Sequence, residues 1–381
     1  MNKALMFFPV LLLVVVMGCA SGGNKEAAPG TETGQDEKGF ERNPPTAAEI
    51  SFQSGEQFLA AGNYDEAISH FRTATSLKPN YLEAWSELGN TLTKVKDFSG
   101  GIAAYQKALE IAPDNNTLIS SIAYNYLYVE NWDKAEEYYS KLVAKDSLSY
   151  EGNVHLGFIY QKKNDVDRAI IAYKKALVAQ PNDATTIGTL AGLYDKNGNE
   201  EMKIEYLKKA IEVAPDNYKF KTQLGSAYMK KKDYASALPV FEDLVKNYPD
   251  EAAYHQNLGL ILSQIPERKG EAPAELEKAL ELKGDDPYVC GVLALVYNDL
   301  GQHQKAIAAV KRGLDTKQGQ EPMLYYQWGA ALSKLEQFDE AISMFERVVQ
   351  AKDPQWSDAA RKQVDRQVAL KKRAEAKKQQ E

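Results

Sequence analysis

The sequence predicts an all-α solenoid of about nine helix-turn-helix repeats that is closed by one C-terminal helix. The first observation is a turn-forming residue every 34 positions, at Pro79, Pro113, Ser147, Pro181, Pro215 and Pro249. Proline ends a helix because it lacks a backbone N–H, and a fixed interval of this length indicates stacked helical hairpins. The second observation is a small residue at the same interval in each first helix. The third is a small residue followed four positions later by an aromatic residue in most second helices. Stacks of this kind usually bind other molecules rather than catalyse reactions.

The chain begins with a predicted targeting segment, residues 1–18. One early charge, Lys3, precedes 14 almost wholly apolar residues, 4–17. This run is too short for a comfortable membrane span and fits the apolar region of a secretory signal peptide.

The end of that segment, Val16-Met17-Gly18-Cys19, resembles the bacterial lipobox. The resemblance implies that Cys19 is lipidated and becomes the first mature residue. Ala20 resembles the outer-membrane class of such lipoproteins, so we expect a lipid-anchored protein of the cell envelope, at the outer membrane and facing the periplasm. The alternatives are an ordinary signal peptide or an uncleaved anchor, each with a chance cysteine.

Residues 19–47 form the lipidated N-terminus and a predicted flexible linker. Gly, Pro, Thr and charged residues dominate this segment, which cannot bury enough apolar surface to fold. Coil scaling gives a typical end-to-end distance of roughly 30 Å.

Residues 48–353 carry the repeats. In one of them Trp85, Leu88 and Gly89 are followed by Tyr105 and Ala108. The small position of the first helix recurs at Gly55, Gly89, Ala123, Gly157, Ala191, Gly225, Gly259 and Gly329. Two helices approach closely only where side chains are small, and an aromatic ring fills the space that remains between units.

This spacing resembles the tetratricopeptide repeat, which implies a superhelical array whose first helices line the concave face. Three repeats depart from the pattern. The fifth has Lys203 and Leu207 where alanine and an aromatic residue are expected, the seventh has an irregular turn at 265–270, and the eighth has Val310 and Gly313 in its second helix.

Residues 354–381 predict a capping helix with a basic tail. Trp356, Ala360, Val364 and Val368 make one apolar stripe at four-residue spacing, and solenoids need a solubilising end helix. The basic residues are expected to be solvated at the helix end, and an anionic contact such as lipid headgroups is the alternative.

The composition gives no sign of a reaction centre. The net charge of −7 disfavours nucleic acid as a partner. The four histidines lie in different repeats, and there is no zinc-protease, nucleophile-elbow or P-loop motif. His255 and Cys290 share the packing position of Trp85, which predicts that His255 is partly buried and that Cys290 is a buried thiol packed as a small apolar group. We therefore expect no catalytic residue, no metal, no cofactor and no small-molecule substrate.

The predicted working surface is the concave face, which would bind a protein or peptide partner of the cell envelope. Its candidate residues lie in the second to fourth repeats: Asn90, Tyr124, Leu127, Val154, Phe158 and Gln161. The apolar ones could dock an extended segment or an amphipathic helix. The alternative is that these side chains only pack against neighbouring first helices.

Three functions fit the sequence to different degrees. The first is a membrane-tethered scaffold for protein–protein interactions. The second is a more specific role, either as a pilotin-like assembly factor for pilus or secretin machinery or as an adaptor that recruits cell-wall hydrolases. The third, an enzyme with a recruiting arm, lacks a segment long enough to form a catalytic domain.

Overall fold

The computed structural model describes residues 44–316 and 321–380, and every regular element in those ranges is a helix. Nine helix pairs are followed by α19 (Ser357–Gln380). The first helices of the pairs are α1 (Ala47–Ala60), α3 (Leu82–Lys94), α5 (Asn116–Tyr128), α7 (Tyr150–Lys162), α9 (Ala184–Lys196), α11 (Tyr218–Lys230), α13 (Ala252–Gln264), α15 (Pro287–Asp299) and α17 (Pro322–Lys334). The second helices are α2 (Tyr64–Leu77), α4 (Phe98–Ile111), α6 (Trp132–Lys145), α8 (Val166–Ala179), α10 (Glu200–Val213), α12 (Tyr234–Asn247), α14 (Ala272–Lys283), α16 (His303–Leu314) and α18 (Phe338–Gln350).

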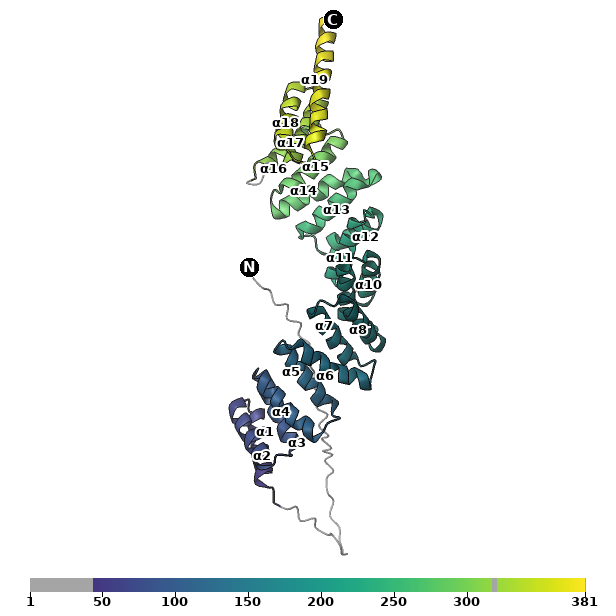
Figure 1. Ribbon diagram of the computed structural model, residues 1–381. Coiled ribbons are helices and arrows are strands. Elements are labelled where there is room, and N and C mark those ends of the chain that lie inside the picture. The colour runs from purple at the N-terminus through teal and green to yellow at the C-terminus, as the bar shows by residue number, and fades with distance from the viewer. Residues whose placement is uncertain (1–43, 317–320, 381) are drawn as a thin grey trace, which may run out of the picture. The chain divides into compact units, whose positions relative to one another are not determined.

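Each helix packs against the helices before and after it in the chain, so the pairs follow one another in sequence order (Figure 1). This is the predicted all-α repeat solenoid. The predicted signal segment, Cys19 and almost all of the predicted linker lie outside the described residues.

The turns between repeats explain the 34-residue interval. Each of the first six second helices ends two residues before its turn residue, as α2 ends at Leu77 before Pro79. The residue six positions after the turn residue lies in the next first helix, and its side chain contacts the carbonyl group of the turn residue. Trp85 Nε1 donates to the carbonyl of Pro79 (2.8 Å), and His255 Nε2 lies 2.8 Å from the carbonyl of Pro249.

Asp and Asn residues cap the second helices at the same interval. The side chains of Asp97, Asn131, Asp165, Asn199 and Asp233 each accept a hydrogen bond from a backbone N–H three residues later. These bonds satisfy donors that the first turn of a helix leaves open. The other four second helices, α2, α14, α16 and α18, lack them: the side chains at their N-caps accept no capping bond.

The repeated glycines are explained by rings that lie directly on them. A Cβ added to Gly225 would stand 2.5 Å from Cε2 of Phe241, and one added to Gly157 would stand 2.7 Å from Cε2 of Tyr173. The aromatic residue therefore covers the glycine of its own repeat, rather than mainly filling the gap to the next unit as expected. The aromatic ring fills the space between the paired helices that a side chain at the glycine position would otherwise occupy.

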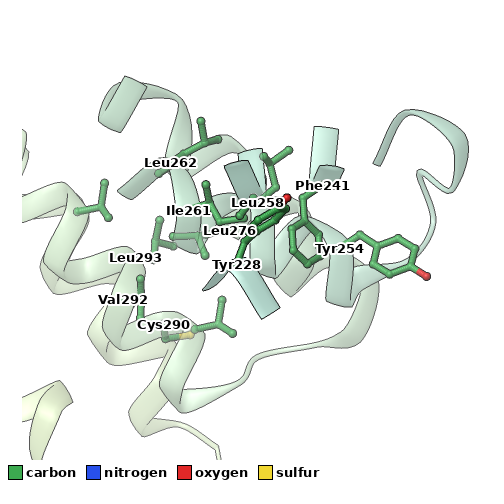
Figure 2. Close-up of a cluster of buried hydrophobic side chains, with 14 of the residues drawn as sticks. Tyr228, Phe241, Tyr254, Leu258, Ile261, Leu262, Leu276, Cys290, Val292 and Leu293 are labelled. Atoms are coloured by element: carbon green, nitrogen blue, oxygen red, sulfur yellow. The ribbon is translucent and has the colours of Figure 1, made fainter. Parts of the chain in front are cut away.

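The core continues from one repeat to the next. Figure 2 shows where the sixth to eighth repeats meet, with Phe241 of α12, Leu276 of α14 and Cys290 of α15 among the buried side chains. Both residues predicted to occupy the Trp85 position are buried: Cys290 is fully covered and His255 is 6% exposed. Burial raises the pKa of the Cys290 thiol to about 11.

The three irregular repeats are accommodated in different ways. Lys203 Nζ pairs with Asp195 (2.9 Å) and Glu200 (3.1 Å) at the site where other repeats have alanine. In the seventh repeat a 3₁₀ helix, η1 (Pro266–Glu271), replaces the short turn. In the eighth, Gly313 admits Cys290 and Leu324, whose carbons would lie 2.9–3.0 Å from an added Cβ.

The two ends of the array differ from its interior. On α1, Ser51, Ser54 and Gln57 stand at positions where the second repeat has the partly buried Trp85 and the buried Leu88 and Thr91, so the outer face of α1 is polar. At the other end, α19 covers α18 with a buried face that includes Ala360 and Val364.

The predicted apolar stripe of α19 is wrong at its last member. Val368 is 37% exposed, and Gln367 is buried instead. Successive four-residue steps rotate around an α-helix because it has 3.6 residues per turn. After three such steps the contact face has passed to the neighbouring residue, where Ser333 Oγ donates to Gln367 Oε1 (2.8 Å).

Candidate functional site

Hydrogen bonds between successive first helices make their exposed sides one surface, here called the first-helix face. Thr93 Oγ1 of α3 donates to Asn125 Oδ1 of α5 (2.9 Å), and Ser120 of α5 donates to Glu151 of α7. Further along the array, Asn298 Nδ2 of α15 donates to the carbonyl of Gln327 of α17 (3.0 Å). The six residues predicted from the sequence belong to α3, α5 and α7.

Four of those six residues are held by contacts of the array itself. Asn90 accepts a hydrogen bond from the Tyr105 hydroxyl (2.6 Å), and Gln161 accepts one from the Tyr173 hydroxyl (2.8 Å). The other two are apolar, partly buried and packed against core clusters; they are Leu127 and Val154. These four side chains shape the face, and little of their chemistry is left for a partner.

The remaining two, Tyr124 and Phe158, belong to a group of aromatic rings. Tyr124 lies 4.8 Å from Tyr128, ring centre to ring centre, and its hydroxyl donates to that of Tyr128 (2.9 Å). Phe98 stacks on Tyr128 at 4.5 Å, and Trp132 contacts Phe158 edge-on at 6.1 Å. We call Phe98, Tyr124, Tyr128, Trp132 and Phe158 the aromatic patch.

Sequence reasoning missed Phe98, Tyr128 and Trp132. The missed signal is an aromatic residue at the first position of successive second helices: Tyr64, Phe98 and Trp132. Each of them meets the next first helix of the array. Phe98 and Trp132 do so within the patch, and Lys94 Nζ lies 5.0 Å from the centre of the Tyr64 ring. Tyr128 is 48% exposed, which makes it the most accessible ring of the patch.

Burial favours the neutral forms of Tyr124, Tyr139 and His155 in and beneath the patch. Burial, followed by the hydrogen bond with Tyr128, raises the pKa of Tyr124. Burial also raises the pKa of Tyr139, and it lowers the pKa of His155, which stacks on Tyr139 at 4.6 Å. The patch therefore offers aromatic faces and tyrosine hydroxyl groups, which suit an apolar segment of a partner. One cation lies against it: Lys162 Nζ is 5.2 Å from the centre of the Phe158 ring.

Tyr139 is buried with an unpaired hydroxyl. Its equivalents Tyr105 and Tyr173 donate to Asn90 and Gln161, but the hydroxyl of Tyr139 has no hydrogen-bond partner within the described residues. The reason is positional: Tyr124 and Leu127 stand where the other two repeats have Asn90 and Gln161. A buried donor without an acceptor costs roughly 1–3 kcal/mol.

Two open clefts lie away from the first-helix face. One of about 740 Å³ is lined by Ile68, Arg72 and Leu77 of α2 and by Leu92 of α3. Another of about 380 Å³ lies between α8 and α10, with Leu177 and Tyr206 among its lining residues. Neither cleft is lined by a residue predicted from the sequence.

No group of three or more His, Cys, Asp or Glu side chains in residues 44–316 and 321–380 could hold a metal ion. In the same ranges, each helix is too short or too polar to cross a bilayer.

Family models described as tetratricopeptide repeat match most of the array. They cover residues 58–123 and 204–261, then 121–184, and then 184–217, 287–319 and 324–353. The chain belongs to the tetratricopeptide repeat family. The unmatched stretch between 261 and 287 holds η1, and the unmatched start of the array is the polar helix α1.

Tetratricopeptide repeat proteins of varied origin are similar to the chain. The BBSome complex member BBS4 of Bos taurus is 24% identical over 297 residues, which are 77% of this chain and 56% of that protein. Its homolog in Drosophila melanogaster is 26% identical over 222 residues, 58% of this chain and 45% of that one. The repeat-containing protein YpiA of Bacillus subtilis is 22% identical, over 62% of this chain and 64% of its own. The chain thus spans about half the length of the first two relatives.

Solved structures share the helical repeat at low identity. The MamA protein is 20% identical with a TM-score of 0.43, over 45% of this chain and 94% of that one. PilW, titled a type IV pilus biogenesis factor, is 18% identical with a TM-score of 0.41, over 57% of this chain and 100% of its own. A tetratricopeptide repeat scaffold of this kind is suited to protein–protein interaction.

Proposed function

We propose that this protein is a membrane-tethered, non-catalytic scaffold of the bacterial cell envelope, and that the aromatic patch binds a protein or peptide partner. The observation that carries the proposal is the set of aromatic rings at the first-helix face. Tyr128 is exposed, and the other four rings are partly exposed. At the positions of Tyr124 and Tyr128, the second, fifth and sixth repeats have small or polar residues: Asn90 and Lys94, Gly192 and Lys196, and Ser226 and Lys230. The fourth repeat has Phe158 and Lys162 there.

Aromatic side chains that lose little conformational freedom are the usual anchors of protein interfaces. Tyr124 and Tyr128 are already ordered by their mutual hydrogen bond, and Phe98 holds the second ring. A partner's apolar side chains would cover these rings with little additional ordering of the scaffold. An extended segment or one face of an amphipathic helix has the dimensions for this site.

The tether is proposed from the sequence of residues 16–19. A thioether-linked lipid on Cys19 would hold the protein at a bilayer, because each buried CH₂ contributes about 0.8 kcal/mol. Labelling with a fatty-acid probe is expected to mark the wild type and not Cys19→Ser. Equal labelling of both would refute the tether and leave the patch untested by that result.

Site-specific photo-crosslinking in intact cells tests the patch. A photoreactive phenylalanine analogue would replace Tyr128 in one strain and Ile171 in a control strain. Ile171 is 55% exposed on the second helix α8, so it reports chance encounters. We expect a discrete crosslinked product from position 128 that the Tyr124→Ala/Phe158→Ala background loses.

The crosslinked product also decides between the two specific roles. A pilus or secretin component would support an assembly factor, and a cell-wall hydrolase would support an adaptor. Equal products from positions 128 and 171, or a product that is unchanged in the double variant, would refute the patch as the binding site.

A further inference from the structure

The outward side of α19 is strongly basic. The helix contains eight Lys or Arg residues and three Asp or Glu residues, although the whole chain has a net charge of −7. Lys362, Arg366, Arg373 and Lys377 fall within about 60° of one another around the helix axis and extend over about 22 Å of its length. We call these four residues the basic stripe.

The basic stripe points away from the array. Ala360 and Gln367, on the other side of α19, are 0% and 1% exposed, and Lys371 of the same helix pairs with Asp339 of α18. The side that remains for solvent is the one that carries the stripe, and three of its four members, Lys362, Arg366 and Arg373, are exposed. Because α19 is the last element of the array, no further helix covers this side in the described residues.

Three cations of the stripe differ from three arginines of the array. Arg168, Arg268 and Arg312 each pair with two carboxylates. Within residues 44–316 and 321–380, Lys362, Arg366 and Arg373 form no ion pair with an acidic side chain. Their charges are thus not neutralised by this part of the molecule.

We propose that the basic stripe docks on an anionic phospholipid surface. A membrane surface presents a continuous negative potential, which a straight row of long, flexible cations can meet without a shaped cavity. Their aliphatic stems can lie along the interface while the charged groups reach the headgroups. Neither of the two clefts includes a residue of α19, which agrees with a flat partner rather than an inserted one.

Nucleic acid is the less favoured anion. Sites for single-stranded nucleic acid combine cations with aromatic rings on which bases stack. The sequence of α19 has no Phe, Tyr or Trp. The net negative charge of the chain would also repel a long polyanion that passes beyond the helix.

The test uses the chain from residue 19 onward with Cys19→Ser, so that no lipid contributes. Its sedimentation would be measured with vesicles of phosphatidylcholine alone and of phosphatidylcholine mixed with phosphatidylglycerol, at low and high salt. The stripe variant is Lys362→Gln/Arg366→Gln/Arg373→Gln. The matched control is Lys175→Gln/Lys246→Gln/Lys283→Gln, which removes the same charge from exposed positions on α8, α12 and α14.

We expect binding to the acidic vesicles only, its loss at high salt, a decrease of at least about tenfold in the stripe variant, and no change in the control. Equal binding to neutral vesicles, or an equal decrease in the control, would overturn the proposal. So would tighter binding to a short DNA duplex that the stripe variant loses, because the partner would then be nucleic acid. Neither variant alters Cys19 or the aromatic patch, so this result is independent of the function proposed above.

Discussion

Replacing Gly225 by alanine tests whether ring-on-glycine contacts hold the helix pairs together. The added Cβ would lie 2.5, 3.0 and 3.1 Å from three carbons of Phe241, whose side chain is fully buried. The ring would have to move by almost 1 Å, between helices that are closely packed around it. Overpacking of this kind costs up to about 3 kcal/mol. Alanine favours a helix over glycine by about 1 kcal/mol, so we expect the free energy of unfolding to fall by about 2 kcal/mol in total.

Gly192→Ala is the matched control. Gly192 lies inside α9, and a Cβ added there would meet nothing within 4 Å. The same chemical change should therefore stabilise the protein by up to about 1 kcal/mol. Because both variants change the unfolded chain in the same way, the difference of about 3 kcal/mol reports the native contact.

Urea unfolding followed by circular dichroism measures both variants. A third variant, Gly225→Ala/Phe241→Leu, copies the natural pair Ala191 and Leu207 and should recover at least about 1 kcal/mol relative to the sum of the single changes. If Gly225→Ala unfolds at the same urea concentration as Gly192→Ala, the packing explanation for the repeated glycines is refuted.

Three further predictions concern buried or paired polar groups. Tyr139→Phe should raise the free energy of unfolding by about 1 kcal/mol, because the hydroxyl that it removes is unpaired. Tyr105→Phe should lower the free energy of unfolding by a similar amount, because a hydrogen bond is lost. Urea midpoints that move in the same direction for both variants would contradict this. The hydrogen bond from Lys230 lowers the pKa of Glu200 below its usual 4.5. The pair therefore stabilises the fold above that pH, and this contribution is lost as the pH falls through the folded-state pKa. Lys230→Met should be less stable than the wild type at neutral pH and nearly equal to it in acid, and a pH-independent difference would exclude this origin. The Cys290 thiol, fully buried and with a pKa of about 11, should resist alkylation at pH 8 until the eighth repeat unfolds, so fast labelling of the native protein would show that this part of the core is open.

Much of the fold could be predicted because its signals are local and recur. Pro79 and its equivalents end helices through their own backbone chemistry, and Asp97 or Asn131 caps the helix that follows it. Gly225 and Phe241 are separated by a fixed distance along one hairpin. A contact within one repeat is thus present in the sequence as a spacing, and it is visible several times.

The candidate site was only partly predictable for the opposite reason. Tyr124 and Phe158 were found because they lie on first helices, but the rings that complete the patch from second helices were not. Phe98 stacks on Tyr128 and Trp132 contacts Phe158, each from the preceding second helix. Nothing in the spacing alone showed that Asn90 and Gln161 would be engaged by tyrosines of their own repeats. These pairings depend on how one repeat is rotated against the next.

The sequence by itself determined an array of paired helices, with small residues where the helices meet, and the resemblance of its first residues to a lipoprotein signal. Tertiary structure alone decided that the Tyr139 hydroxyl has no acceptor among the described residues, that Lys203 joins an ion-pair network, and that the basic stripe of α19 faces outward. The physical reason is that periodic burial specifies which residues are covered, whereas the direction of each remaining side chain depends on the rotation of its helix against a neighbour.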